Sequence, residues 1–222
     1  MSVSLKPLDR QVIVITGASS GIGLATARDA AQRGASLVLV SRSGDVLEAV
    51  AGTIAAEGAQ VLSVAADMAD RKQVEHVAAE ALARFGRIDT WVNNAGCTIY
   101  GRLDEVSEAD SRRLFETNFW GMVYGSLEAV EHFRKRPGGG KLINVGSVLS
   151  DFSIPEQGIY VASKHAVKGF TNSLRMEMIR EGAPVSVSLI KPSGIASPYK
   201  DHAPNYMDDP ARIPAPLYAP EV

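Results

Sequence analysis

The sequence has little cysteine, no excess of charge of either sign and no long apolar run near its start. Cys97 is the only cysteine among 222 residues, which excludes an internal disulfide and a thiolate-rich metal site. Lys and Arg total 23 against 25 Asp and Glu, so there is no basic field for nucleic acid or an anionic membrane. Residues 1–10 include Lys6, Asp9 and Arg10 and resemble neither a signal peptide nor a membrane span. We therefore expect a cytoplasmic protein with a small-molecule partner and no metal.

Hydrophobic residues make up 45% of the chain and charged residues 22%, as in an ordinary water-soluble domain that buries its own core. Proline is unevenly distributed, because seven of the 11 prolines fall in the last 31 residues. These prolines are Pro192, Pro198, Pro204, Pro210, Pro214, Pro216 and Pro220. Proline interrupts helices and central strands, so we expect no long regular element there. We predict one domain over residues 1–222, with a core at 10–191 and a loop region at 192–222.

Short apolar runs alternate with helical segments along residues 10–191. Six runs predict strands buried on both faces, at residues 12–15, 37–40, 61–64, 89–92, 141–145 and 185–190. The clearest helix spans 70–85, with a capping-box pattern at Asp70 and Gln73 and a stop at Gly86. Residues 137–140 read as a turn from helix to strand. The alternation predicts an α/β fold, a doubly wound parallel sheet of the Rossmann type in three layers.

A glycine-rich turn, Thr16 to Gly23, follows the first strand and precedes a helical segment at 24–32. Glycines let the backbone turn sharply and allow a diphosphate to approach the main chain at the start of a helix. The position therefore favours dinucleotide binding, with a plain glycine-rich turn as the alternative. No Gly-Lys-Ser/Thr triplet follows, which argues against a P-loop.

Further motifs follow in a fixed order. Residues 93–96 read Asn-Asn-Ala-Gly at the end of the fourth strand, and residues 160–164 read Tyr-Val-Ala-Ser-Lys. With the Thr-Gly-x-x-x-Gly-x-Gly turn, these motifs resemble the short-chain dehydrogenase/reductase family over most of the chain. The resemblance implies an oxidoreductase acting on a carbonyl or alcohol with NAD(P). It implies a catalytic tetrad of Asn118, Ser147, Tyr160 and Lys164.

Tyr160 and Lys164 are four residues apart, so on a helix they project from one face. An ammonium near a phenol favours the phenolate and lowers its pKa from about 10. The resemblance implies that Tyr160 exchanges a proton with the substrate oxygen and that Lys164 also bonds the nicotinamide ribose. It further implies that Ser147 bonds the same oxygen and that Asn118 holds a relay water. Each residue also has a structural alternative: Tyr160 and Lys164 as a surface pair, Ser147 as a cap or turn residue, and Asn118 as a bend or solvent contact.

The resemblance implies cofactor contacts on the glycine-rich turn and just beyond several strands. The residues concerned are Gly17, Ser19, Ser20, Gly21, Ile22, Gly23, Ser41, Arg42, Asp67, Met68, Asn94, Ala95, Gly96, Tyr160, Lys164, Pro192, Ser193, Gly194, Ile195 and Ser197. The second strand ends at Ser41 and Arg42, without the carboxylate that would bind a ribose 2′-hydroxyl. A guanidinium suits a 2′-phosphate, so the sequence favours NADP, with NAD and a merely solvated Arg42 as alternatives.

Asp67 has the position whose carboxylate bonds the adenine amino group in the family, and a loop or capping aspartate is the alternative. Ser193 stands where the family usually has glycine, and Ser197 keeps a hydroxyl for the nicotinamide amide. Ile195 offers its backbone to the same amide.

Substrate specificity is expected in the loops around the cleft. Candidate pocket residues are Ile99, Tyr100, Leu149, Phe152, Ile154, Tyr199 and Tyr206, and Cys97 reads as a small wall residue. The family's final helix and edge strand are expected to be lacking from this chain, and a homodimer or homotetramer is expected. A catalytically silent NAD(P)-binding sensor or scaffold is the alternative. A sugar-nucleotide epimerase or dehydratase is disfavoured by the glycine spacing.

Overall fold

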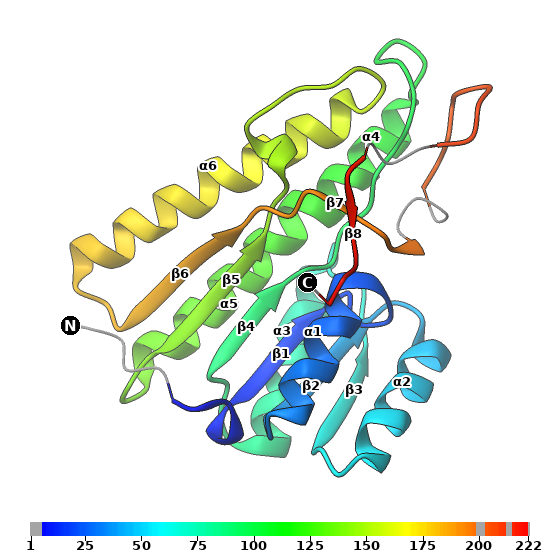
Figure 1. Ribbon diagram of the computed structural model, residues 1–222. Helices are drawn as coiled ribbons and strands as arrows, with labels where there is room; N and C mark the ends of the chain where they lie inside the picture. The colour runs from blue at the N-terminus through cyan, green and yellow to red at the C-terminus, as the bar shows by residue number, and fades with distance from the viewer. Residues whose placement is uncertain (1–5, 199–202, 212–214, 222) are drawn as a thin grey trace.

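The computed structural model describes residues 6–198, 203–211 and 215–221. A six-stranded parallel sheet lies at its centre, in the order β3-β2-β1-β4-β5-β6 (Figure 1). The strands are β1 (Val12–Thr16), β2 (Ser36–Ser41), β3 (Val61–Ala65), β4 (Thr90–Asn93), β5 (Gly140–Val145) and β6 (Val185–Ile190). All six predicted strands and the Rossmann-type fold class are confirmed. The strand order reverses between β1 and β4, and open sheets of this kind bind ligands at such a reversal.

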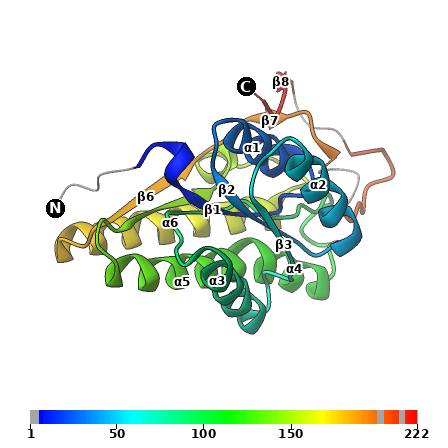
Figure 2. The ribbon, with the colours of Figure 1, turned by 90° about the horizontal axis from the view of Figure 1, so that it is seen from below.

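Helices cover both faces of the sheet (Figure 2). They are α1 (Gly21–Gln32), α2 (Gly44–Ala56), α3 (Arg71–Phe85), α4 (Glu108–Phe115), α5 (Gly121–Lys135) and α6 (Gly158–Glu181). Alternate side chains of β1 point to opposite faces: Ile13 and Ile15 pack with α1 and α2, and Val12 and Val14 with the core under α3, α5 and α6. These two cores hold the three layers together.

The helix predicted at residues 70–85 is α3. The side chain of Asp70 accepts the Lys72 N–H at 2.9 Å, and Gly86 ends the helix with a φ of 72°. The predicted capping box does not close, because the Asp70 N–H already donates to the Asp67 carbonyl at 3.0 Å. Gln73 Oε1 instead accepts the Asp67 N–H at 2.8 Å. The cap therefore also fixes Asp67, just beyond β3.

Other boundaries are close to those predicted. α1 begins at Gly21 rather than Leu24, because Ser20 already has the extended backbone of an N-cap. Between α5 and β5 lies the predicted turn, with Gly140 as the first residue of the strand. A short 3₁₀ helix, η1 (Leu8–Arg10), precedes β1.

The described part of residues 192–222 contains two short strands, β7 (Gly194–Ile195) and β8 (Leu217–Tyr218), which pair in parallel. No longer regular element occurs in the described residues there, as the prolines predict. β6 is an edge strand of the large sheet, since no described strand pairs with its outer side. Within the described ranges, every helix is too short or too polar to cross a membrane.

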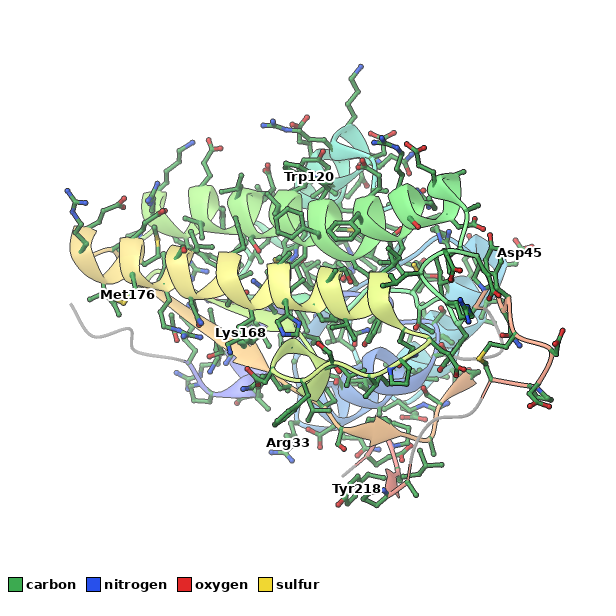
Figure 3. All side chains as sticks on the ribbon, turned by 90° about the horizontal axis from the view of Figure 1, so that it is seen from above. Arg33, Asp45, Trp120, Lys168, Met176 and Tyr218 are labelled. Atoms are coloured by element: carbon green, nitrogen blue, oxygen red, sulfur yellow. The ribbon has the colours of Figure 1, made fainter. Side chains whose placement is uncertain are left out.

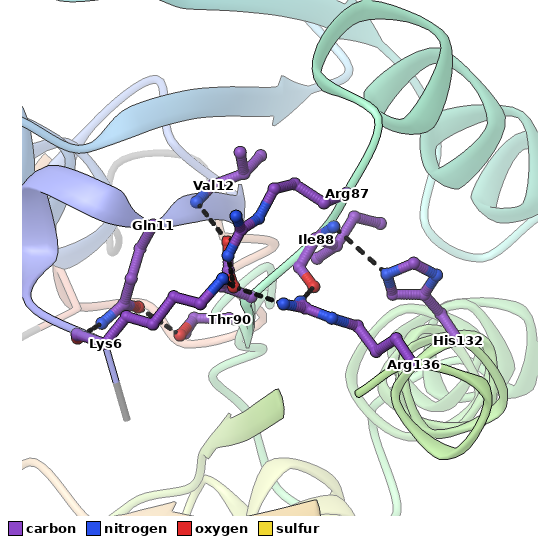
Figure 4. Close-up of polar contacts among 9 residues, drawn as sticks. Lys6, Gln11, Val12, Arg87, Ile88, Thr90, His132 and Arg136 are labelled. Atoms are coloured by element: carbon purple, nitrogen blue, oxygen red, sulfur yellow. Dashed lines mark hydrogen bonds and ion pairs between the residues drawn. The ribbon is translucent and has the colours of Figure 1, made fainter. Parts of the chain in front are cut away.

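A charged cluster holds the sheet at the end opposite the carboxyl ends of the strands (Figure 4). The buried carboxylate of Asp89 accepts the Val12 N–H at 2.9 Å, Arg87 Nε at 2.8 Å and Arg136 Nη2 at 2.8 Å. Lys6 Nζ lies 3.6 Å from Asp89 Oδ1. Burial opposes the charge on Asp89, but these donors outweigh it and hold the pKa of its carboxyl below the usual value. The cluster ties β1 and β4 to the end of α5.

Exposed apolar side chains gather on α5, on α6 and at the turn before α5. Leu127, Met176 and Ile179 are exposed, and Trp120 stacks on Tyr124. Figure 3 shows Trp120 and Met176 on the side of α5 and α6, with Tyr218 of β8 on the opposite side.

Candidate active site

Two adjoining cavities lie along the carboxyl ends of the strands. We call the first the tyrosine cavity; its lining is Gly17, Ser20, Gly21, Ile22, Asn94, Ala95, Gly96, Val145, Gly146, Ser147, Tyr160, Lys164, Pro192, Ser193, Ile195 and Ser197. The second, the arginine cavity, is lined by Gly17, Ser19, Ser20, Ser41, Arg42, Ser43, Ala66, Asp67, Met68, Ala95, Gly96 and Thr117. They share four lining residues, so together they form one extended cleft across the strand reversal.

The glycine-rich turn forms the floor between the two cavities. Gly17 has a φ of 67°, and a Cβ there would lie 2.9 Å from the Cα of Ala95. A Cβ on Gly23 would lie 2.2 Å from the Gly17 carbonyl oxygen. Only glycine therefore fits at either position, and the start of α1 is left open to a ligand. The unpaired N–H groups of that helix start favour an anion such as a diphosphate.

Asn94 ties the glycine-rich turn to the end of β4. Its Nδ2 donates to the carbonyl oxygens of Thr16 at 2.9 Å and Gly17 at 3.1 Å. In return, Thr16 Oγ1 accepts the N–H groups of Asn94 and Ala95, each at 3.0 Å. These four bonds fix two of the loops that line both cavities.

Asn93 points the other way, into the core below the cleft. Its Nδ2 donates to Asn144 Oδ1 at 2.9 Å and Ser126 Oγ at 3.1 Å, and its Oδ1 accepts Trp91 Nε1 at 2.8 Å. Asn144 continues to Thr171 Oγ1 at 3.0 Å. A buried polar network with its members bonded in this way holds β4, β5, α5 and α6 in one arrangement.

Tyr160 and Lys164 lie on α6 with one turn between them, as their spacing predicts. Lys164 Nζ is 5.7 Å from the centroid of the Tyr160 ring and donates to the Val145 carbonyl at 3.0 Å. Only 5% of Lys164 is exposed, and burial lowers the pKa of its ammonium to about 8. An ammonium has three donors, so further N–H groups remain beyond the bond to Val145.

Ser147 begins a 3₁₀ turn, η3 (Val148–Ser150), directly after β5. Its Oγ accepts the Leu149 N–H at 3.1 Å, and Ser150 Oγ accepts the Ser147 N–H at 3.2 Å. The hydroxyl of Ser147 thus acts as a cap through its lone pair, and Ser147 also lines the tyrosine cavity. Asp151, the next residue after η3, pairs with Lys168 of α6 and with Lys191 beyond β6. The turn is therefore held from both sides.

Asn118 does not line either cavity. It lies on a π-helical turn, η2 (Glu116–Trp120), and its Oδ1 and Nδ2 bond the N–H and carbonyl of Cys97, each at 2.8 Å. Its Nδ2 also donates to Ser163 Oγ at 3.2 Å. Its side chain thus fastens the Cys97 backbone to α6, and the water-holding role stays a prediction. Burial raises the pKa of the Cys97 thiol, which keeps it protonated.

In the arginine cavity, the Ser41 hydroxyl donates to Ser19 Oγ at 3.2 Å and joins β2 to the glycine-rich turn. The exposed guanidinium of Arg42 forms no ion pair or hydrogen bond with any residue that the structure describes. Asp67 is paired, since its Oδ2 lies 2.6 Å from Arg113 Nη2 of α4. Among the described residues, this cavity therefore combines the unpaired cation of Arg42 with the Asp67 carboxylate, whose charge Arg113 compensates.

Most of the predicted site residues line the cleft, and three do not: Gly23 is packed beneath the turn, Asn118 bonds Cys97, and Gly194 belongs to β7. The residues that the sequence analysis missed are Ser43, Ala66, Thr117, Val145 and Gly146. All except Thr117 lie at or just beyond a strand end, and that position alone could have identified them.

The candidate substrate residues are scattered. Ile99 is buried with Tyr160 in a small core that Cys97, Leu149 and Tyr206 also contact. A separate cavity is lined by Tyr100, Ile154 and Tyr206, among others. Phe152 is 67% exposed. Tyr199 lies outside the described residues.

Comparison with known proteins identifies the family. The family model for short chain dehydrogenases matches residues 11–206. An uncharacterized oxidoreductase of Bacillus subtilis, YxnA, is 46% identical over 99% of this chain, which spans 62% of that relative's length. A short chain dehydrogenase/reductase from Burkholderia phymatum, solved in complex with NAD, superposes with a TM-score of 0.87 at 34% identity, covering 89% of this chain and 70% of the other. An alcohol dehydrogenase from Thermococcus sibiricus, complexed with 5-hydroxy-NADP, superposes with a TM-score of 0.83 at 29% identity, covering 95% of this chain and 86% of the other. The chain belongs to the short chain dehydrogenase family of oxidoreductases.

Proposed function

We propose that this chain is an NADP-dependent oxidoreductase that interconverts a carbonyl compound and a secondary alcohol, with Tyr160 as general acid and base. The observation that carries the proposal is the Tyr160–Lys164 pair beside Ser147, in a cleft that continues to the guanidinium of Arg42, which pairs with no described residue. The two solved neighbours described above carry NAD and 5-hydroxy-NADP, so they support a nicotinamide nucleotide without choosing between the two forms.

The residues of the cleft suit such a nucleotide. The glycine-rich turn and the start of α1 would hold the diphosphate, and the glycines leave the space that this approach needs. Arg42 would bind the 2′-phosphate, and Asp67 the adenine amino group. Lys164 would bond the nicotinamide ribose, and the backbone at Ile195 with the Ser197 hydroxyl would hold the nicotinamide amide.

A bound nicotinamide supplies or accepts the hydride. During reduction, Tyr160 Oη gives its proton to the carbonyl oxygen, so that hydride plus proton convert the carbonyl to an alcohol. Ser147 donates a hydrogen bond to the same oxygen, where negative charge develops in the transition state. The Lys164 ammonium stabilises the tyrosinate that remains after proton transfer. In alcohol oxidation the same groups act in reverse.

Arg42→Ala is expected to raise the Kd for NADPH by about 10- to 100-fold, because a charge-assisted bond to a phosphate is lost. The Kd for NADH should change little, since NADH has no 2′-phosphate. Parallel titration of both cofactors measures the two effects. Arg33→Ala, at an exposed arginine paired with Asp29 at the end of α1, is the matched control. Equal affinities for both cofactors that Arg42→Ala leaves unchanged would contradict the NADP assignment.

The pH profile of ketone reduction should follow the protonation of the Lys164 amine. The pKa of Lys164 is lowered to about 8, so the amine is charged below this pH and neutral above it. If Tyr160 depends on that charge, kcat/KM falls by up to about tenfold per pH unit above the pKa. Steady-state rates across the pH range test this, with Lys164→Arg as the comparison. Arginine stays charged, so an active variant should lose the alkaline fall, and a fall that persists would assign it to another group.

We further propose that residues 10–191 form the cofactor-binding core of a single domain and that 192–222 form the substrate loop. Apolar side chains exposed on α5 and α6, Leu127, Met176 and Ile179, support a homodimer or homotetramer through these helices. The single cysteine supports a cytoplasmic location.

A further inference from the structure

We propose that Arg113 is a second determinant of cofactor choice: by pairing with Asp67 it removes a negative charge that would otherwise face the 2′-phosphate. This inference rests on the proposed binding of NADP in the arginine cavity. It assigns a cofactor-specificity role to a residue of α4 that lines neither cavity.

Asp67 and Arg42 leave neighbouring strands side by side. Ser41 of β2 is in register with Ala65 of β3, and the Ala66 N–H donates to the Ser41 carbonyl at 3.0 Å. Arg42 and Asp67 follow these paired positions, on strands about 5 Å apart. Both side chains line the arginine cavity. A phosphate bound by Arg42 would therefore share this cavity with the Asp67 carboxylate.

Arg113 is held where it can compensate this carboxylate. Its Nη2 lies 2.6 Å from Asp67 Oδ2, with 43% of the arginine side chain and 28% of the aspartate side chain exposed. The neighbouring Leu114 is buried and anchors α4. Thr117, one turn further along the same helical run, lines the arginine cavity. The contact therefore reaches the arginine cavity through Asp67 and joins two separate elements, unlike a pair within one helix.

The other bonds of Asp67 do not replace Arg113. Its Oδ1 accepts the Ala69 N–H at 3.0 Å, which is a neutral donor. Among the described residues, Arg113 is the one cation that pairs with this carboxylate. Without Arg113, the full negative charge of Asp67 would act on the cavity. For a doubly charged phosphate about 10 Å away in water, this repulsion corresponds to a Kd change on the order of three- to tenfold.

The test is a double-mutant cycle on cofactor binding, without turnover. The Kd values for NADPH and NADH are measured by calorimetry for wild type, Arg113→Met, Asp67→Asn and the double variant. Arg113→Met should raise the Kd for NADPH by about fivefold and that for NADH by less than about twofold. In the Asp67→Asn background, Arg113→Met should have little effect on either Kd, because no charge remains at residue 67 to be compensated. Arg112→Met is the matched control, since Arg112 pairs with the exposed Glu108 on the same helix.

Two results would overturn the inference. One is an equal rise in the Kd values for NADPH and NADH in Arg113→Met, which indicates a general distortion of the site. The other is an unchanged effect of Arg113→Met in the Asp67→Asn background. If wild type binds NADPH no more tightly than NADH and Arg42→Ala has no effect, the proposed NADP preference itself fails. If Arg42→Ala weakens NADPH binding but the double-mutant cycle shows no coupling between Arg113 and Asp67, only the role of Arg113 fails.

Discussion

Tyr160→Phe is expected to lower kcat for ketone reduction by about 10²- to 10⁴-fold, the usual contribution of a positioned general acid. The phenyl ring fills the same space beside Lys164 and Ser147, so the Kd for NADPH should stay within about twofold of wild type. The loss should appear in kcat because the proton transferred by Tyr160 Oη is needed in the transition state. Steady-state kinetics with a panel of ketones, combined with a cofactor titration, measure both quantities.

Tyr124→Phe is the matched control for this change. Tyr124 lies on α5, stacks on Trp120 and lines neither cavity of the cleft. Removing its hydroxyl should leave kcat unchanged. Full activity of Tyr160→Phe would contradict the proposed mechanism, and so would an equal loss in the two variants.

Gly23→Ala is expected to abolish tight cofactor binding and to destabilise the fold. The added Cβ would lie 2.2 Å from the Gly17 carbonyl oxygen and 2.6 Å from Asn94 Nδ2, both of which are held by other contacts. Either α1 or the glycine-rich turn must move, and the start of α1 then no longer faces the diphosphate. We expect a rise of about 100-fold or more in the Kd for NADPH and a loss of about 1–3 kcal/mol in the free energy of unfolding. Calorimetric titration and urea denaturation test the two effects.

Gly52→Ala is the control for a glycine in a helix without close neighbours. Gly52 lies in α2, and a Cβ there would meet nothing within 4 Å. Alanine should therefore stabilise the helix by up to about 1 kcal/mol and leave cofactor binding unchanged. If Gly23→Ala behaved like Gly52→Ala, the close approach at Gly23 would not be a requirement of the cofactor site.

The parts of the fold that the sequence predicted are those that depend on local composition. β-branched runs such as residues 12–15 predict strands because a parallel strand is apolar on both faces. The glycine-rich turn and the order of Ser147, Tyr160 and Lys164 likewise predicted residues that meet in the cleft. The strands of a parallel sheet have their carboxyl ends at one edge, which brings the glycine-rich turn and Ser147 together. Tyr160 and Lys164 lie on α6 and were predicted from the resemblance to the family.

Contacts between distant elements could not be predicted in the same way. The Gln73 side chain was expected to accept the Asp70 N–H, but that N–H donates to the Asp67 carbonyl, and Gln73 Nε2 instead donates to Asp70 Oδ2 at 3.1 Å. The Arg113–Asp67 pair joins residues 46 positions apart, and no local pattern distinguishes Arg113 from Arg112. The attachment of Asn118 to Cys97 likewise depends on how α4 and η2 are placed over the sheet.

The most direct test of hydride transfer in this cleft uses NADPH deuterated at the transferable position of the nicotinamide. Wild-type protein is incubated with the labelled cofactor and a panel of ketones, and the products are analysed by mass spectrometry. We expect a secondary alcohol with one deuterium on its carbinol carbon, formed by wild type and far more slowly by Tyr160→Phe. Tight binding of NADPH without labelled alcohol from any ketone would contradict hydride transfer in this cleft and favour a cofactor-binding sensor or scaffold.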